Sequence, residues 1–448
     1  MKLKRFKENT KKKIIVISFT VLCLLLIAGV YLYTSYAFYE ETKNFNVING
    51  TVEDPGDLYF AYYVDGKISR TMPSKNIGYT LDTTKSSCDN GVTVDWDYSK
   101  WKANIYYENY AATDNTRTKC TLYFNKTAKT VKTALGNIEV NSYKPDLTKS
   151  ACDTSNCESH EKGIFETTDA DGTSYYYRGA VENNYLKFAG YYWRVVRING
   201  NGSVRIIYDG TSAHGNGESS TDRQYGTSQF NTNYNNNMYV GYMYTSGEAH
   251  GTGTSSVIKT NADKFYTDKL ASYASKLDTN AGFCGDRSNL NQQSGVGTGT
   301  VITYNKGYLR VEESAPTLTC ENASDYYTVA SASSGNKKLS YPIGLITADE
   351  VMLAGHAGGV FDGGFNHQKT NNGSYLVTGN LFWTMTPAGG YNPFGFTGWY
   401  AIVFYVNGSG YIDDHNAYDT FGLRPVVNLK SGVTITGSGT KTDPYVVS

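Results

Sequence analysis

The chain has 448 residues, and its 41 basic residues are balanced by 41 acidic ones. Beyond the first 13 residues, however, 34 basic residues face 40 acidic ones, which leaves a formal charge near −6. Binding to nucleic acid needs a basic face, so this charge balance excludes nucleic acid as a partner. The same part of the chain is rich in Tyr, Gly, Asn, Ser and Thr and is long enough for two or three domains.

The N-terminal part has the pattern of a membrane anchor. Residues 1–13 hold seven Lys or Arg, and residues 14–33, "IIVISFTVLCLLLIAGVYLY", carry no charge. Twenty residues in a helix, rising about 1.5 Å each, span the roughly 30 Å hydrocarbon core of a bilayer. Because a basic flank stays in the cytoplasm, we expect residues 1–39 to form a tail and a single-pass helix in the cell membrane. The remainder is then extracellular.

A second interpretation is that this segment is a signal peptide that is removed. Ser35-Tyr36-Ala37 has the small-x-small pattern of a signal-peptidase site. Residues 36–52, "YAFYEETKNFNVINGTV", are similar to the start of mature matrix-fibre proteins of the camelysin type. That resemblance implies a secreted, fibre-forming protein that starts at Phe38. The apolar run is longer than the usual signal core of about 7–15 residues, which favours the retained anchor.

Six cysteines lie outside the apolar segment, and an even number in an exported chain predicts disulfides. Sequential pairing is expected because each neighbouring pair falls within one predicted domain: Cys88 with Cys120, Cys152 with Cys157, and Cys284 with Cys320. A zinc site is not predicted, because the chain has no C-x-x-C motif and its six histidines are scattered.

Residues 40–126 are predicted to form a small immunoglobulin-like β-sandwich. "DLYFAYYVDGKIS" reads as two strands joined by a tight turn at Asp65-Gly66. Further strand-like runs follow, and the Cys88–Cys120 bond is expected to join the two sheets, as in immunoglobulin-like domains. We expect this module to be a spacer.

Residues 127–162 read as a linker and the start of a larger C-terminal domain, residues 163–448. Strands are predicted within residues 175–210, and again within 374–386, 399–412 and 421–430. Between them, residues 259–280 and 344–355 are predicted helices. The second helix has a capping box, Thr347 with Glu350, and ends at Gly355. The predicted fold class is α+β and β-rich.

The C-terminal motifs, taken in order, resemble a family of surface proteins of gut Gram-positive bacteria. They include "AGFCGDRS" (281–288), "GLITADEVMLAGH" (344–356) and "FGLRPVVNLK" (421–430). The C-terminal domain of that family is similar to the C-type-lectin-like fold of formylglycine-generating enzymes. The resemblance implies that Trp383 and Arg424 belong to the structural frame, with Arg424 donating hydrogen bonds to loop carbonyls. Those enzymes use cysteines near their C-terminal strands, and this chain has none after Cys320, so a domain without enzymatic activity is expected.

Two segments carry the candidate ligand contacts. The loop "TPAGGYNPFGFTGWY" (386–400) offers Tyr391, Phe394 and Trp399, whose flat rings suit a sugar or peptide, although we expect Trp399 to be buried. The run "IDDHNAYD" (412–419) adds the side chains of Asp413, Asp414 and His415. A polar hairpin end is the favoured interpretation of this run and no cofactor is expected, although its oxygen ligands would suit calcium.

One motif points to enzymatic chemistry. "APTLTC" (315–320) is similar to the sortase strand that carries a nucleophilic cysteine. A disulfide between Cys284 and Cys320 is favoured, because a bonded cysteine cannot supply a thiolate. The sequence therefore predicts an anchored extracellular protein that binds a glycan, a wall polymer or a protein. The alternatives are a secreted matrix protein and, less favoured, an enzyme that modifies wall polymers.

Overall fold

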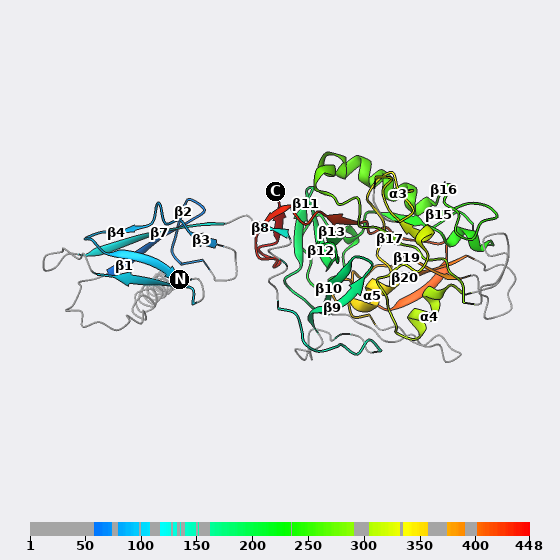
Figure 1. Ribbon diagram of the computed structural model, residues 1–448, viewed down its shortest axis with the longest axis horizontal. Coiled ribbons are helices and arrows are strands. Elements are labelled where there is room, and N and C mark those ends of the chain that lie inside the picture. Colours follow the sequence, from blue (N-terminus) through cyan, green and yellow to red (C-terminus); the bar gives the residue numbers. More distant parts are fainter. Residues whose placement is uncertain are drawn as a thin grey trace, which may run out of the picture. The chain divides into compact units, whose positions relative to one another are not determined.

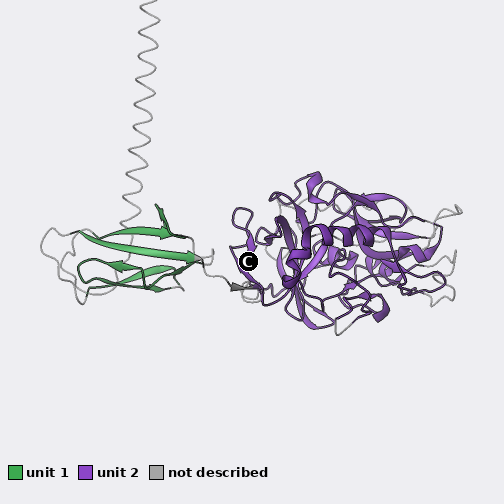
Figure 2. Ribbon diagram, turned by 90° about the horizontal axis from the view of Figure 1, so that it is seen from above, with its two compact units in different colours: residues 1–75, 79–125 green, residues 76–78, 126–448 purple. Residues whose placement is uncertain are grey.

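The chain is β-rich with few helices in the computed structural model, which confirms the predicted α+β, β-rich class. Two compact units are formed, residues 1–75 with 79–125 and residues 76–78 with 126–448 (Figure 2). The structure describes residues 58–73, 79–97, 100–107, 117–126, 129–131, 135, 139–148, 151, 162–233, 235–290, 304–331, 335–356, 374–389 and 401–448. The predicted anchor, the cleavage motif and the Cys152–Cys157 pair lie outside these ranges. No helix among the described residues is long and apolar enough to cross a membrane.

Unit 1 consists of a five-stranded sheet and a separate hairpin. The sheet contains β1 (Leu58–Val64), β2 (Lys67–Ser69), β3 (Tyr79–Leu81), β4 (Ser87–Cys88) and β7 (Thr118–Lys126). The hairpin pairs β5 (Thr93–Asp97) with β6 (Lys102–Tyr106). The tight turn predicted between β1 and β2 is confirmed: Asp65 and Gly66 both have positive φ, as a two-residue hairpin turn requires.

The disulfide of unit 1 differs from its expected role. Cys88 on β4 lies directly opposite Cys120 on β7, so the bond joins two neighbouring strands of one sheet and does not join two sheets. The packing between the sheet and the hairpin is aromatic instead. The ring of Trp96 on β5 meets that of Phe124 on β7 edge to face, with centroids 5.0 Å apart.

Unit 2 is built on a nine-stranded sheet. Its main path runs β23-β13-β12-β11-β25-β24-β8, and β10 pairs with both β12 and β9. The strands are β8 (Lys129–Thr130), β9 (Gly163–Asp169), β10 (Gly172–Arg178), β11 (Tyr185–Phe188), β12 (Tyr191–Ile198), β13 (Val204–Gly210), β23 (Val426–Leu429), β24 (Thr434–Thr436) and β25 (Tyr445–Val447). Figure 1 shows β8 beside the C-terminal strands, so the two ends of unit 2 meet in this sheet.

A second, five-stranded sheet follows the order β14-β22-β19-β20-β21. Its strands are β14 (Thr227–Gln229), β19 (Phe382–Gly389), β20 (Ile402–Val406), β21 (Ile412–Asn416) and β22 (Thr420–Gly422). Every residue of β20 is buried between β19 and β21, as the apolar pattern on both faces predicts.

The stretch predicted as one strand, residues 421–430, is two strands in two different sheets. Strand β22 ends at Gly422 in the five-stranded sheet, and β23 begins at Val426 in the nine-stranded sheet. Leu423, Arg424 and Pro425 form the crossing between them. Proline has no N–H for a sheet ladder, which is consistent with a break at this position.

The helical segments are short. The predicted helix 259–280 is α3 (Val257–Phe265), continued by a π-helical turn η4 (Tyr266–Leu270) and a 3-10 segment η5 (Ala271–Lys276). Helix α5 (Ala348–Leu353) has the predicted capping box. The other elements of unit 2 named among the described residues are helix α4 (Lys306–Glu312), the short pieces η2 (Thr221–Arg223), η3 (Asn237–Val240) and η6 (Ala323–Asp325), and the strand pairs β15 (Met243–Tyr244) with β16 (Thr254–Ser255) and β17 (Phe283–Cys284) with β18 (Tyr326–Tyr327).

The core of unit 2 joins α3 to the large sheet through aromatic side chains. Trp193 on β12, Tyr208 on β13 and Phe265 on α3 are buried, and their ring centroids lie 5.8–6.2 Å apart. Burial of each such side chain stabilises the fold by about 1.5–3 kcal/mol. These contacts fix the end of α3 against the large sheet.

Candidate functional site

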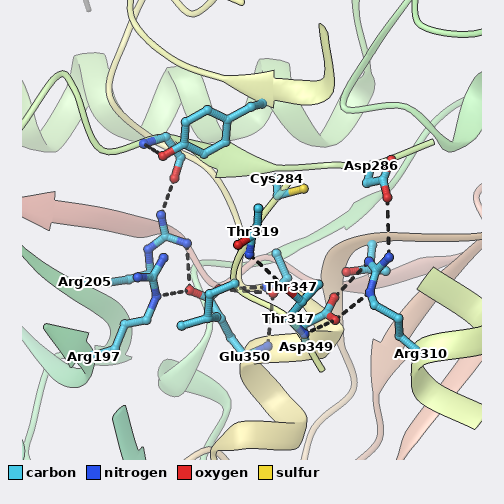
Figure 3. Close-up of a pocket in the computed structure, with 14 residues that line it drawn as sticks. Arg197, Arg205, Cys284, Asp286, Arg310, Thr317, Thr319, Thr347, Asp349 and Glu350 are labelled. Atoms are coloured by element: carbon cyan, nitrogen blue, oxygen red, sulfur yellow. Dashed lines mark hydrogen bonds and ion pairs between the residues drawn. The ribbon is translucent and has the colours of Figure 1, made fainter. Parts of the chain in front are cut away.

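The pocket drawn in Figure 3 is organised around the carboxylate of Glu350, at the start of α5. Oε1 of Glu350 lies 2.8 Å from Nε of Arg197 on β12 and 2.7 Å from Nη1 of Arg205 on β13. Oε2 accepts the backbone N–H of Thr347. Burial alone would raise the pKa of Glu350, but the two guanidinium groups outweigh it and lower that pKa. A carboxylate held ionised in this way is not poised to act as a general acid.

The opposite wall of this pocket is a second ion-pair group. Nε of Arg310 on α4 lies 2.7 Å from Oδ1 of Asp349, and its Nη1 lies 3.4 Å from Oδ2 of Asp286. Cys284 also lines the pocket and is bonded to Cys320, which confirms this predicted disulfide. The three arginines of the pocket are therefore matched by three carboxylates.

The size of this pocket decides what it can hold. Its cavity volume is ≈ 20 Å³, which is room for about one water molecule. Pockets that bind small molecules usually measure roughly 300–1,000 Å³. The arrangement in Figure 3 is therefore a buried ion-pair centre that fastens α4 and α5 to the large sheet, and a substrate would not fit.

A larger, open groove lies between the end of η5 and the turn that joins β23 to β24. Its cavity volume is ≈ 620 Å³, within the range of ligand pockets. Backbone hydrogen bonds form its floor, from Lys430 N–H to the Lys276 carbonyl (2.9 Å) and from Asp278 N–H to the Asn428 carbonyl (2.8 Å). It is lined by Ser275, Lys276, Asp278, Thr279, Asn280, Lys430, Ser431, Gly432, Val433 and Thr434.

Two ammonium groups stand in this groove. Nζ of Lys430 donates to the carbonyl of Ser275 over 2.9 Å, and Nζ of Lys276 donates to the main-chain oxygen of Ser448, the last residue. The Ser275 carbonyl is neutral, whereas the Ser448 oxygen belongs to the terminal carboxylate of this chain, so Lys276 has an ionic partner. Oδ1 of Asp278 is occupied by the backbone N–H groups of Asn280 and Ala281. The groove thus presents both ammonium and carboxylate groups.

The predicted ligand contacts are only partly placed. Tyr391, Phe394 and Trp399 lie outside the described residues. Asp413, Asp414 and His415 lie on β21, at the edge of the five-stranded sheet. Burial and then the neighbouring Asp413 raise the pKa of Asp414 to about 7.

These three side chains do not converge. Oδ2 of Asp413 accepts from the hydroxyl of Tyr405 (3.0 Å), while Nδ1 of His415 lies 2.6 Å from Oδ2 of Asp419. No group of three or more His, Cys, Asp or Glu side chains that could hold a metal occurs in the described part of the chain.

Both predicted frame residues are completely buried. Nε1 of Trp383 on β19 donates to the carbonyl of Ser228 on β14 over 2.9 Å. Arg424 donates from Nε to the carbonyl of Tyr208 (3.1 Å) and from Nη1 to that of Leu376 (2.9 Å). Each side chain therefore links segments distant in sequence through backbone carbonyls.

The groove residues were not singled out by sequence reasoning. Lys276 closes a helical segment and Lys430 follows a strand, and no motif connects two positions 154 residues apart. Only the backbone pairing of residues 276–278 with 428–430 brings them together. Comparison of the chain with protein families, curated proteins and solved structures found no match.

Proposed function

We propose that this chain is a membrane-anchored extracellular protein of a Gram-positive bacterium whose C-terminal unit binds a surface ligand without altering it. In this proposal residues 14–33 are the anchor, unit 1 is an immunoglobulin-like spacer, and unit 2 is a C-type-lectin-like head. The observation that carries the proposal is the groove at Lys276 and Lys430. It has the volume of a ligand site, whereas the Glu350 pocket has room for a water molecule and its charges are already paired.

The cysteines support export. Disulfides join Cys88 to Cys120 and Cys284 to Cys320. Such bonds form and persist in oxidising environments outside the cytoplasm. A basic N-terminus followed by an uncharged run of 20 residues supplies the anchor that this location needs.

The test uses the full chain in a Gram-positive host. Protease added to intact cells should cleave unit 2, and the cells should retain glycans or wall polymers from an array that cells lacking the protein do not retain. The retained ligand should be recovered unchanged by mass spectrometry. A chain that resists protease on intact cells, or a ligand recovered as cleaved or transferred product, would contradict the proposal.

A second candidate function, assembly into a matrix or fibre, is favoured by one face of unit 1. Tyr63 on β1 is paired with Ile68 on β2 and Tyr123 on β7, so the three side chains share a face of the sheet. The rings of Tyr63 and Tyr123 stack with centroids 4.6 Å apart, and Ile68 is 77% exposed. Exposed apolar patches promote association. A released chain starting at Phe38 and sedimenting as polymers would favour this candidate over the anchored receptor.

A further inference from the structure

We infer that one face of the unit 1 sheet docks on the outer leaflet of the membrane that holds the anchor, so that its partner is a phospholipid surface. This inference rests on the proposed function, because it requires residues 14–33 to span the membrane. We call this surface the tyrosine face. Its side chains are Tyr59, Ala61 and Tyr63 on β1, Ile68 on β2, and Lys119, Thr121 and Tyr123 on β7.

Alternation along the strands separates the tyrosine face from the core of unit 1. On β7 the side chains of Leu122 and Phe124 are buried in that core, whereas Thr121 and Tyr123 are only half-buried. Successive side chains of a strand point to opposite faces of the sheet. The β5–β6 hairpin packs on the Phe124 side, so the tyrosine face is turned away from it.

The side chains of this face suit the boundary between hydrocarbon and water. Tyr59 is 46% exposed and Ile68 is 77% exposed. The rings of Tyr63 and Tyr123 stack beside Ile68, with centroids 4.6 Å apart. A tyrosine combines an apolar ring with a polar hydroxyl, and this residue type is enriched where proteins cross the membrane–water interface.

The charge of the tyrosine face is compatible with anionic lipid headgroups. Lys119, which lies opposite Tyr59, is the one charged side chain among its seven residues. Asp82 lies beyond the face, where its carboxylate accepts from Asn125 and is paired with Lys85 over 3.4 Å. Lysine near a membrane surface is attracted by anionic lipids.

The length of chain between the anchor and β1 favours the bilayer as the occupant. Residues 34–57 make this connection, and 24 residues extend over no more than about 85 Å. A tethered surface meets its partner in an intramolecular step, so even a weak affinity produces docking. The bilayer is the one surface that such a tether always supplies.

The experiment uses the full chain in vesicles of equal parts phosphatidylcholine and phosphatidylglycerol. A nitrobenzoxadiazole fluorophore is attached at Ile68→Cys, and a lipid with a nitroxide near its headgroup, present in both leaflets, serves as the quencher. The matched control is Thr93→Cys on β5. Thr93 is exposed on the outer side of the hairpin, because the next residue, Val94, packs in the core.

Both reporters are placed in a chain with Cys23→Ser, so that the anchor is not labelled. The same chain without an added cysteine gives the background from the remaining thiols. A further variant adds Tyr59→Asp to the Ile68→Cys chain and places a carboxylate on the tyrosine face. Circular dichroism of each purified full-length variant establishes that a loss of quenching is not a loss of folding.

We expect the nitroxide lipid to quench the fluorophore at position 68 several-fold more strongly than the one at position 93. Tyr59→Asp should reduce the quenching at position 68 to that of the control. Vesicles of phosphatidylcholine alone should give weaker quenching at position 68, because they lack the anionic partner of Lys119.

Equal quenching at positions 68 and 93 in chains that float with the vesicles would overturn the inference and leave the proposed function intact. Fluorescence at position 68 that ignores the nitroxide but rises on dilution with unlabelled chain would also overturn it, because a second copy then covers the face. A chain that does not float with the vesicles would overturn both the inference and the anchored receptor.

Discussion

Arg424 donates from Nη2 to Oδ1 of Asp209 over 3.0 Å, and both side chains are completely buried. Arg424 lies where the chain crosses from β22 to β23, and Asp209 lies near the end of β13 in the large sheet. Oδ1 of Asp209 also accepts from Nε of Arg223 at 2.8 Å. Burial lowers the pKa of Arg424 to about 9, although Asp209 acts in the opposite direction. One carboxylate thus holds the crossing between two sheets.

Asp209→Asn should therefore destabilise unit 2 strongly. Removing the charge of one partner leaves buried guanidinium groups uncompensated, which typically costs about 3–5 kcal/mol. Thermal unfolding of the full chain, followed by circular dichroism, should show a lower Tm. Asp268→Asn is the control, since its partner Lys264 is exposed and such pairs contribute less than about 1 kcal/mol. Equal effects of the two substitutions would argue against this role of Asp209.

The capping box of α5 should contribute less to stability than Asp209 does, and its contribution should depend on one hydroxyl group. The Thr347 hydroxyl accepts the N–H of Glu350, and the Glu350 carboxylate accepts the N–H of Thr347. Thr347→Ala removes the first contact and should cost about 1 kcal/mol, measured by denaturant unfolding. Thr347→Ser retains a hydroxyl at the same place and should restore most of the loss. A serine variant as unstable as the alanine variant would show that the methyl group, not the cap, matters.

The Cys284–Cys320 bond should stabilise unit 2 by constraining the unfolded chain. The two cysteines are separated by 36 residues, and closing a loop of that length contributes about 4 kcal/mol in the chain-entropy treatment. The double variant Cys284→Ser with Cys320→Ser should accordingly unfold at lower denaturant concentration. Nonreducing peptide mapping should recover residues 284 and 320 in one linked pair. Recovery of Cys320 as a free, alkylated thiol would contradict the structure and reopen the enzymatic interpretation.

Asp414 predicts a pH dependence with a defined sign. Its pKa is raised to about 7 by burial and by Asp413, whereas an unfolded aspartate titrates near 3.9. Between about pH 4 and 7 the folded state therefore retains a proton on Asp414 that the unfolded state releases. The stabilisation of the fold by this protonated side chain is complete below about pH 4. It is lost as pH rises through about 7. The difference in Tm between the wild type and Asp414→Asn should change over that window, and a constant difference would contradict the raised pKa.

Local patterns predicted the elements whose signals lie within a few residues. The Asp65-Gly66 turn, the α5 capping box and the buried strand β20 are each specified by neighbours in sequence. Two expectations were wrong because the deciding partner is distant. Cys88 and Cys120 bridge one sheet, and residues 421–430 divide between two sheets.

The sequence predicted the candidate site less well than it predicted the fold. Aromatic residues and clustered aspartates are typical of binding sites, so the sequence predicted ligand contacts within residues 386–400 and 412–419. The groove depends instead on two common lysines that backbone pairing brings together. Apart from Arg424, the buried arginines, including Arg194, Arg223 and Arg287, were equally hard to predict, because arginine is normally an exposed residue.

Lysine footprinting on intact cells tests both the extracellular location of unit 2 and the groove at Lys276 and Lys430 as its ligand site. A membrane-impermeant acylating reagent is applied to cells that display the full chain, with and without a ligand that the cells retain from the array, and lysine labelling is quantified by mass spectrometry. We expect Lys276, Lys430 and Lys269 to be labelled on intact cells, and the bound ligand to protect Lys276 and Lys430 but not Lys269, which lies on η4 outside the groove lining. Absence of labelling at all three lysines would contradict the extracellular location. Equal labelling of Lys276 and Lys430 with and without that ligand would contradict the groove as the binding site.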